Sequence, residues 1–140
     1  MNNNRLLFLL IVILGTILRL YHLSNNPPSL YWDEVSLGYN AFSILNYGID
    51  EHGEPYPLAR FIAFGDFKPP GYIYATVPSI FLFGVNEFAV RFPSAFSGTL
   101  FIVATYLLAK EIFKKEKIAL FSALFIAISP WSLQLSRAAF

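Results

Sequence analysis

The sequence contains no cysteine and few charged residues. Of its 140 residues 14% are charged, and the net charge is +1, whereas a typical soluble domain is about 25% charged. Without cysteine, a disulfide scaffold and every thiolate metal site are excluded. A net charge close to zero also excludes a nucleic-acid-binding protein that relies on a concentrated basic surface.

Hydrophobic and aromatic residues are abundant instead. They make up 56% and 18% of the chain, with 15 Phe and 8 Tyr, and the mean hydropathy is +0.53. An aromatic surplus is typical of membrane–water interfaces. The composition therefore predicts an integral membrane protein. Because 140 residues hold few spanning helices, the length favours a fragment of a larger membrane protein.

Three apolar runs are long enough to be transmembrane helices, which need about 20 residues. They cover approximately residues 6–23, 89–113 and 118–135. The first run could also be the core of a secretory signal peptide, but no small-x-small cleavage site follows it. We therefore favour an uncleaved anchor in which Arg19 extends to the membrane interface.

The charge distribution predicts the orientation of these spans. Residues 110–117 form a short loop with four lysines, and lysine-rich loops stay in the cytoplasm. The N-terminus, with Arg5, would lie on the same side. The long loop 24–88, which holds seven of the nine acidic residues, would then be outside. The apolar stretch 71–84 is too short to span and contains Pro78, so it predicts a juxtamembrane helix.

The predicted fold class is therefore an all-α integral membrane protein, with three transmembrane helices and juxtamembrane amphipathic helices in a long outer loop. In that loop, Asp33 and Glu34 open a helical pattern that runs to Tyr47 and is followed by Gly48, a residue typical of helix C-caps. The two carboxylates either stabilise the positive end of the helix dipole or take part in chemistry. Both interpretations stay open at this point.

Two further polar clusters lie in the outer loop. Residues 50–57 include three carboxylates and His52 but no defined ligand spacing, which favours a solvated loop over a metal site. Lys68-Pro69-Pro70 precedes the short apolar helix, at the expected depth of the lipid headgroups. There the lysine could hold a lipid phosphate as a point charge or act as an interfacial anchor with no specific ligand.

Several of these elements follow one another in an order that resembles the GT-C glycosyltransferases, above all the protein O-mannosyltransferases and the lipid A aminoarabinose transferases. The resemblance covers the chain from about residue 19 onward. The elements that carry it are Asp33-Glu34, Gly48, Lys68-Pro69-Pro70 with Tyr72, Phe83-Gly84, Asn86-Glu87-Phe88, Arg91-Phe92-Pro93-Ser94-Ala95, Ser129-Pro130-Trp131 and Ser136-Arg137.

The resemblance implies an enzyme that moves a sugar from a polyprenyl-phosphate donor to a lipid, glycan or protein acceptor outside the membrane. It makes Asp33 and Glu34 candidate catalytic residues, with Asp33 as general base or acceptor-positioning carboxylate. It also makes Lys68 a contact of the lipid phosphate and Arg137 a second donor-binding candidate. Family members have more spans than three, so residues 1–140 are expected to be the N-terminal part of the membrane domain and inactive alone.

Cofactors, location and alternative functions complete the prediction. A divalent metal could assist the leaving phosphate, but no residues fix a site for it. The expected location is the plasma membrane, as a multi-pass protein with a cytoplasmic N-terminus, membrane lipids as partners and no nucleic acid. A polyprenyl-lipid transporter or flippase component would place charges near the bilayer midplane, where the second and third spans have none. A small structural subunit leaves the ordered motifs unexplained, so an enzyme is favoured.

Overall fold

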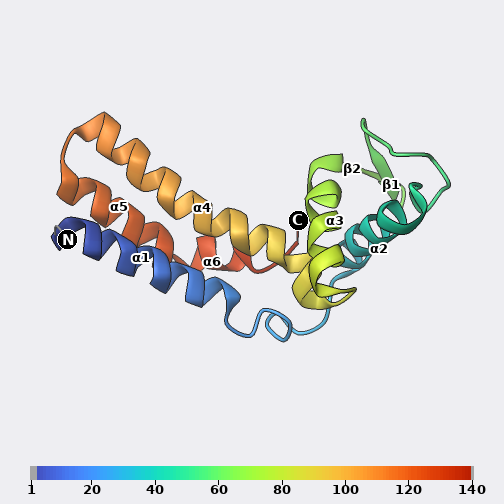
Figure 1. The fold of residues 1–140 in the computed structure, drawn as a ribbon, viewed down its shortest axis with the longest axis horizontal. Coiled ribbons are helices and arrows are strands. Elements are labelled where there is room, and N and C mark those ends of the chain that lie inside the picture. The colour runs from blue at the N-terminus through green and yellow to red at the C-terminus, as the bar shows by residue number, and fades with distance from the viewer. Residues whose placement is uncertain (1–2, 140) are drawn as a thin grey trace. The chain divides into compact units, whose positions relative to one another are not determined.

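The computed structural model describes residues 3–139, so residues 1, 2 and 140 of the predicted 1–140 segment lie outside it. The described chain forms two compact units, residues 3–21 with 94–137 and residues 22–93 with 138–139. Helices predominate (Figure 1), and the elements in chain order are α1 Asn3–Leu20, α2 Trp32–Tyr47, β1 Phe61–Ala63, β2 Asp66–Lys68, α3 Pro70–Phe83, α4 Glu87–Phe113, α5 Glu116–Ile128 and α6 Pro130–Ser136.

The first unit packs α1, most of α4, α5 and α6 side by side (Figure 1). Its core is formed by aliphatic and small residues, including Ile11, Ile102 and Ala123. A Cβ atom at Gly15 would lie 2.2 Å from Cδ1 of Ile102, so a larger residue at this position would require the Ile102 side chain to move. Close approach at small residues is typical of helices packed within membranes.

Two helices of this unit, α1 and α4, are long and apolar enough to cross a membrane. Helices α5 and α6 meet the same criterion together but bend by 57° where they join, so there are two candidate spans, or three if the bent pair counts as one. The predicted mostly helical membrane protein is confirmed at this level. The helices differ from the predicted spans in their bounds. Helix α1 runs from Asn3 to Leu20 rather than over residues 6–23, and α4 begins at Glu87 rather than residue 89. The predicted continuous span 118–135 is broken at Ser129.

Pro130 accounts for the break in the third span. Its ring disfavours the helical conformation of the residue before it, and Ser129 is extended, with φ −60° and ψ 123°. A proline is nevertheless well tolerated at the first position of a helix, because that position needs no N–H donor. The chain therefore stops one helix and starts another at this point.

The second unit contains α2, the β1–β2 hairpin, α3 and the first turns of α4. Leu37 and Ile44 of α2 pack with Ile73 and Ile80 of α3 in a buried core. Helix α2 ends, as predicted, at Gly48, which is left-handed with φ 71°. The helix predicted at 71–84 is confirmed as α3, which is one residue earlier at each end.

The segment predicted to form the outer loop also contains a β-hairpin that the predicted all-α architecture lacks. Strands β1 and β2 pair antiparallel, with Phe61 opposite Lys68. Gly65 adopts a φ of 78° in the turn, a conformation that is easiest for glycine. Phe61 on β1 is fully buried. Because it pairs with Lys68, its burial fixes the end of β2 that carries Lys68.

Candidate functional site

The first turn of α2 and the end of β2 bring Asp33 and Lys68 together. Lys68 Nζ lies 2.7 Å from Asp33 Oδ1 and 3.6 Å from Asp66 Oδ2, and the side chains of Lys68 and Asp33 are 20% and 26% exposed. The hydrogen bond to Asp33 is the main reason why the pKa of Lys68 is raised above its ordinary value. Lys68 is therefore a cation that remains accessible from outside the protein.

Aromatic residues form a second contact between α2 and the hairpin. Trp32 stacks on Phe64 of the hairpin turn, with 5.7 Å between the ring centroids, and both side chains are more than half exposed. Tyr31 packs edge-on against Trp32 at 5.4 Å. The neighbours of Asp33 thus hold the hairpin beside the start of α2, which keeps the Lys68 ammonium in reach of the carboxylate.

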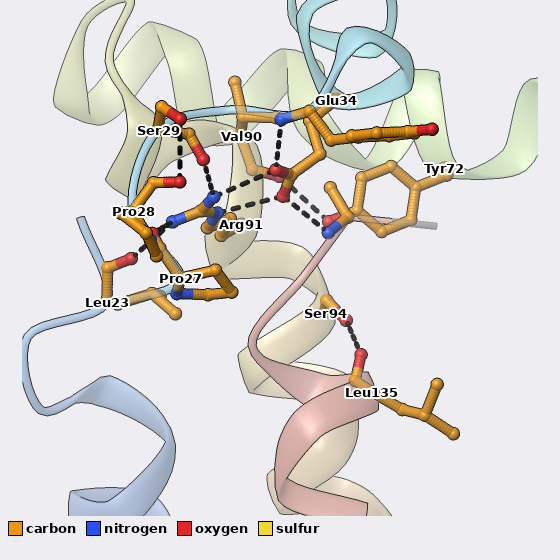
Figure 2. A network of polar contacts seen from close by, with 12 residues as sticks. Leu23, Pro27, Pro28, Ser29, Glu34, Tyr72, Val90, Arg91, Ser94 and Leu135 are labelled. Atoms are coloured by element: carbon orange, nitrogen blue, oxygen red, sulfur yellow. Dashed lines mark hydrogen bonds and ion pairs between the residues drawn. The ribbon is translucent and has the colours of Figure 1, made fainter. Parts of the chain in front are cut away.

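Glu34, the neighbour of Asp33, points into the protein (Figure 2) and is only 2% exposed. Its Oε1 accepts hydrogen bonds of 2.9 Å from Arg91 Nε and from the backbone N–H of Ala139. Its Oε2 accepts two more, also of 2.9 Å, from Arg91 Nη2 and from the backbone N–H of Tyr31. A carboxylate has about four acceptor positions, so the described contacts occupy all of them.

These hydrogen bonds decide the ionisation state of Glu34. Burial is the largest single influence on the pKa of Glu34 and raises it, because a charged group loses hydration in the interior. The hydrogen bonds from Arg91, Tyr31 and Ala139 together outweigh burial and lower the pKa of Glu34 below its ordinary value. Glu34 is therefore an ionised carboxylate whose acceptor positions are all bonded, whereas the side chain of Asp33 is 26% exposed.

Arg91 carries the other half of this network and is fully buried. Besides binding Glu34, it donates to the backbone oxygens of Leu23, Pro27 and Ser29, at 3.1, 2.7 and 2.6 Å. These carbonyls lie along the segment that leads into α2, as Figure 2 shows. Arg91 therefore fixes both the path of this segment and the first turn of the helix that carries Asp33.

Arg91 was not among the predicted site residues. A signal for a role was present, because Arg91 lies between Val90 and Phe92 inside the apolar run at residues 89–113. An arginine within such a run is costly unless a partner compensates its charge. Glu34 is one of the seven acidic residues of the predicted outer loop that could compensate this charge.

The prediction that Arg19 extends to the membrane interface is wrong. Arg19 is fully buried in the first unit and donates to the backbone oxygens of Ile126 and Ala127, both at 3.2 Å, and to Oγ of Ser132 at 2.9 Å. The break at Ser129 explains this, because the last carbonyls of α5 have no partner within their own helix. The guanidinium of Arg19 satisfies them.

Arg137 also binds backbone carbonyls. Its guanidinium donates to the oxygens of Leu18 and Tyr21, at 2.6 and 2.8 Å, where α1 ends with unpaired carbonyl groups. These contacts belong to the first unit, whereas Asp33 and Lys68 belong to the second. Of the four predicted site residues, the structure brings Asp33 and Lys68 into direct contact.

The acidic cluster at residues 50–57 forms an ordered loop. Asp50 is buried, and its Oδ1 accepts hydrogen bonds of 2.8 Å from the backbone N–H groups of His52 and Glu54. Glu51 accepts a hydrogen bond of 3.0 Å from the side chain of Asn40 on α2. Within residues 3–139, no three His, Asp or Glu side chains gather in a way that could hold a metal ion.

Long apolar helices, with a lysine–carboxylate pair in the segment between two of them, define a membrane protein that has an accessible ionic site outside its candidate spans. A family model described as dolichyl-phosphate-mannose-protein mannosyltransferase matches residues 9–140, and the chain belongs to this family. This finding confirms the resemblance to the mannosyltransferase-type glycosyltransferases. Searches of curated proteins and of solved structures gave no match to the chain.

Proposed function

We propose that this chain takes part in the transfer of a sugar from a polyprenyl-phosphate donor to an acceptor hydroxyl on the outer face of the plasma membrane. Family membership supports a glycosyltransferase with a lipid-linked sugar donor. The roles within it rest on one observation, the 2.7 Å contact between Lys68 Nζ and Asp33 Oδ1. It places a cation suited to a phosphate next to a carboxylate suited to a proton.

In the proposed reaction, the acceptor hydroxyl gives its proton to Asp33 while its oxygen attacks the anomeric carbon of the donor sugar. The bond from this carbon to the phosphate oxygen breaks, and its electron pair stays on the phosphate. The Lys68 ammonium balances the charge that develops there. In-line attack inverts the anomeric configuration and needs no covalent enzyme intermediate.

The ion pair between Lys68 and Asp33 is the resting state in this proposal. The donor phosphate competes with Asp33 for the Lys68 ammonium, since both are anions of similar hydrogen-bonding chemistry. When Lys68 turns to the phosphate, its ion pair with Asp33 opens, and the carboxylate is free to accept a hydrogen bond from the acceptor hydroxyl. Donor binding would thus prepare the base for the acceptor.

Glu34 and Arg137 have other roles in this proposal. All four acceptor positions of Glu34 are bonded, so we assign it a positioning role, in which it fixes the helix start that orients Asp33. Arg137 binds the last carbonyls of α1, and we assign it the capping of that helix. Asp33 and Lys68 remain the two residues proposed to act on the substrates.

Lys68→Ala is expected to raise the KM for the polyprenyl-phosphate donor about tenfold or more, because a charge-assisted hydrogen bond contributes roughly 1.5–3 kcal/mol. The measurement is transfer from labelled polyprenyl-phosphate mannose by the full-length enzyme in liposomes. Arg60→Ala is the matched control, since Arg60 is an exposed cation of the same loop. Its guanidinium carbon Cζ lies 4.6 Å from the ring centroid of Phe67. Equal effects of the two substitutions would reduce Lys68 to general surface charge.

The proposed orientation can be tested with single cysteines, because the sequence has none of its own. Glu54→Cys and Lys115→Cys replace exposed residues of the outer segment and of the lysine loop. An impermeant thiol reagent should label only Glu54→Cys in intact cells, and Lys115→Cys after permeabilisation. The opposite pattern would reverse the orientation, and equal protection would contradict an exposed outer segment.

A further inference from the structure

A groove of about 570 Å³ runs along the first unit between α1 and α5. Its volume lies within the range of ligand pockets in proteins, about 300–1,000 Å³. The wall is almost wholly apolar, and Asn4 and Lys117 are its only polar residues. The remaining lining residues are Leu7, Leu10, Ile11, Leu14, Leu120, Phe121 and Leu124.

The length of the groove corresponds to one leaflet of a bilayer. On α1 it extends over residues 4–14, which at 1.5 Å per residue is about 15 Å. This is half of the roughly 30 Å thickness of the hydrocarbon core. Helices α1 and α5 begin at the same end of the unit and run side by side (Figure 1), so both polar residues lie at that end.

The charge of Lys117 is available at this end. Among residues 3–139, Lys110 pairs with Glu116 at 3.0 Å and Lys114 pairs with Glu111, whereas Lys117 forms no ion pair. Lys117 also lies in the first turn of α5, where backbone N–H groups and the helix dipole favour anions. The groove thus combines an apolar wall as long as one leaflet with a cation at the end where α1 and α5 begin.

We propose that this groove binds an anionic glycerophospholipid, with an acyl chain along the leucine wall and the headgroup phosphate at Lys117 and Asn4. Basic pockets between transmembrane helices on the cytoplasmic side are suited to anionic headgroups, and the proposed orientation places Lys117 on that side. The site shares no residue with the Asp33–Lys68 pair. The proposed lipid site can therefore be tested independently of the proposed transfer reaction.

The test measures lipid retained by the purified full-length protein, by native mass spectrometry after incubation with phosphatidylglycerol or phosphatidylcholine. Lys117→Ala should lower phosphatidylglycerol retention about fivefold, the factor for one lysine at an anionic membrane surface, with little change for phosphatidylcholine. Lys115→Ala is the matched control, because Lys115 is an exposed lysine two residues before Lys117 that does not line the groove. If general surface charge attracted the lipid, the two variants would lose it equally, which would overturn the proposal.

A second pair of variants tests the apolar wall. Leu10→Trp fills the groove and should reduce retention of both lipids, whereas Leu9→Trp should not, because Leu9 lies outside the groove and is 48% exposed, close to the 52% of Leu10. Equal retention by these two variants would contradict binding in the groove. Displacement of the lipid by soluble glycerophosphate would instead identify a site for free phosphate and would also overturn the proposal. If Leu10→Trp does not insert into the membrane, the comparison of Lys117→Ala with Lys115→Ala still decides the proposal.

Discussion

Asp33→Asn in the full-length enzyme is expected to insert and fold normally and to lose at least about 100-fold in transfer rate, since general-base help contributes about 10²–10⁴-fold. Asparagine has nearly the same shape as aspartate and is also favoured near a helix start. Its amide oxygen can still accept a hydrogen bond from Lys68. The substitution thus removes mainly the proton acceptor and its negative charge.

The alternative role of Asp33 gives a different result. If the carboxylate only stabilises the positive end of the α2 dipole, its neutralisation costs a few tenths to about 1 kcal/mol of folding free energy and leaves the rate almost unchanged. Rate and stability must therefore be measured on the same preparation, with single-turnover transfer and thermal unfolding in detergent. Normal transfer by well-folded Asp33→Asn would return Asp33 to the dipole role.

Asp66→Asn provides a matched control. Asp66 Oδ2 also lies near Lys68 Nζ, at 3.6 Å, but its side chain is 73% exposed. If any carboxylate beside Lys68 supported the reaction, both asparagine variants would lose activity to a similar degree. We expect Asp66→Asn to retain most of the transfer rate, because its longer contact and exposure leave it outside the reacting position.

The sequence predicted helices α2 and α3 but not the hairpin between them. The helical pattern of α2 and the apolar run of α3 each extend over many residues, and the left-handed Gly48 follows the end of α2 as predicted. Strands β1 and β2 have three residues each, too few for a period of two to stand out. The hairpin therefore could not be predicted from the sequence pattern. It depends on tertiary contacts, of which the Lys68–Asp33 pair is one.

The same limit applies to the site. Asp33 and Lys68 were both expected to act on the substrates, but their direct contact depends on the hairpin and could not be predicted. The partners of Arg19 and Arg91 are mostly backbone carbonyls, and no side-chain pattern in the sequence marks a carbonyl as an acceptor. Arg19 was assigned to the interface for this reason, although the broken span at Ser129 creates acceptors for it inside the protein.

The buried pair of Glu34 and Arg91 should give the largest stability effect in the chain. Glu34→Gln or Arg91→Met removes one partner and leaves the other charge buried, which typically costs 3–5 kcal/mol of the free energy of unfolding. The measurement is denaturant unfolding of the purified protein. Glu111→Gln is the control, because the Glu111–Lys114 pair is exposed and such pairs contribute only about 0–1 kcal/mol.

The pH dependence of stability separates Glu34 from other carboxylates. Its pKa in the folded state lies below the ordinary value of 4.5, so its contribution is present at neutral pH and is lost as the pH falls through the folded-state pKa. Wild-type stability should therefore decrease on acidification below about pH 4.5, and Glu34→Gln should lack this component. Parallel pH profiles of the two proteins would contradict the assignment. Per folded molecule, Glu34→Gln should lose less activity than Asp33→Asn.

The double variant Glu34→Met/Arg91→Met distinguishes a simple ion pair from the wider network. Replacing both members of a buried ion pair with apolar residues is often neutral, so a simple pair would regain most of the stability lost by either single variant. Here Arg91 also satisfies three backbone carbonyls, and Glu34 satisfies the N–H groups of Tyr31 and Ala139. Unsatisfied buried groups cost about 1–3 kcal/mol each. The double variant should thus remain at least as unstable as either single variant, and full recovery would show that the charges alone matter.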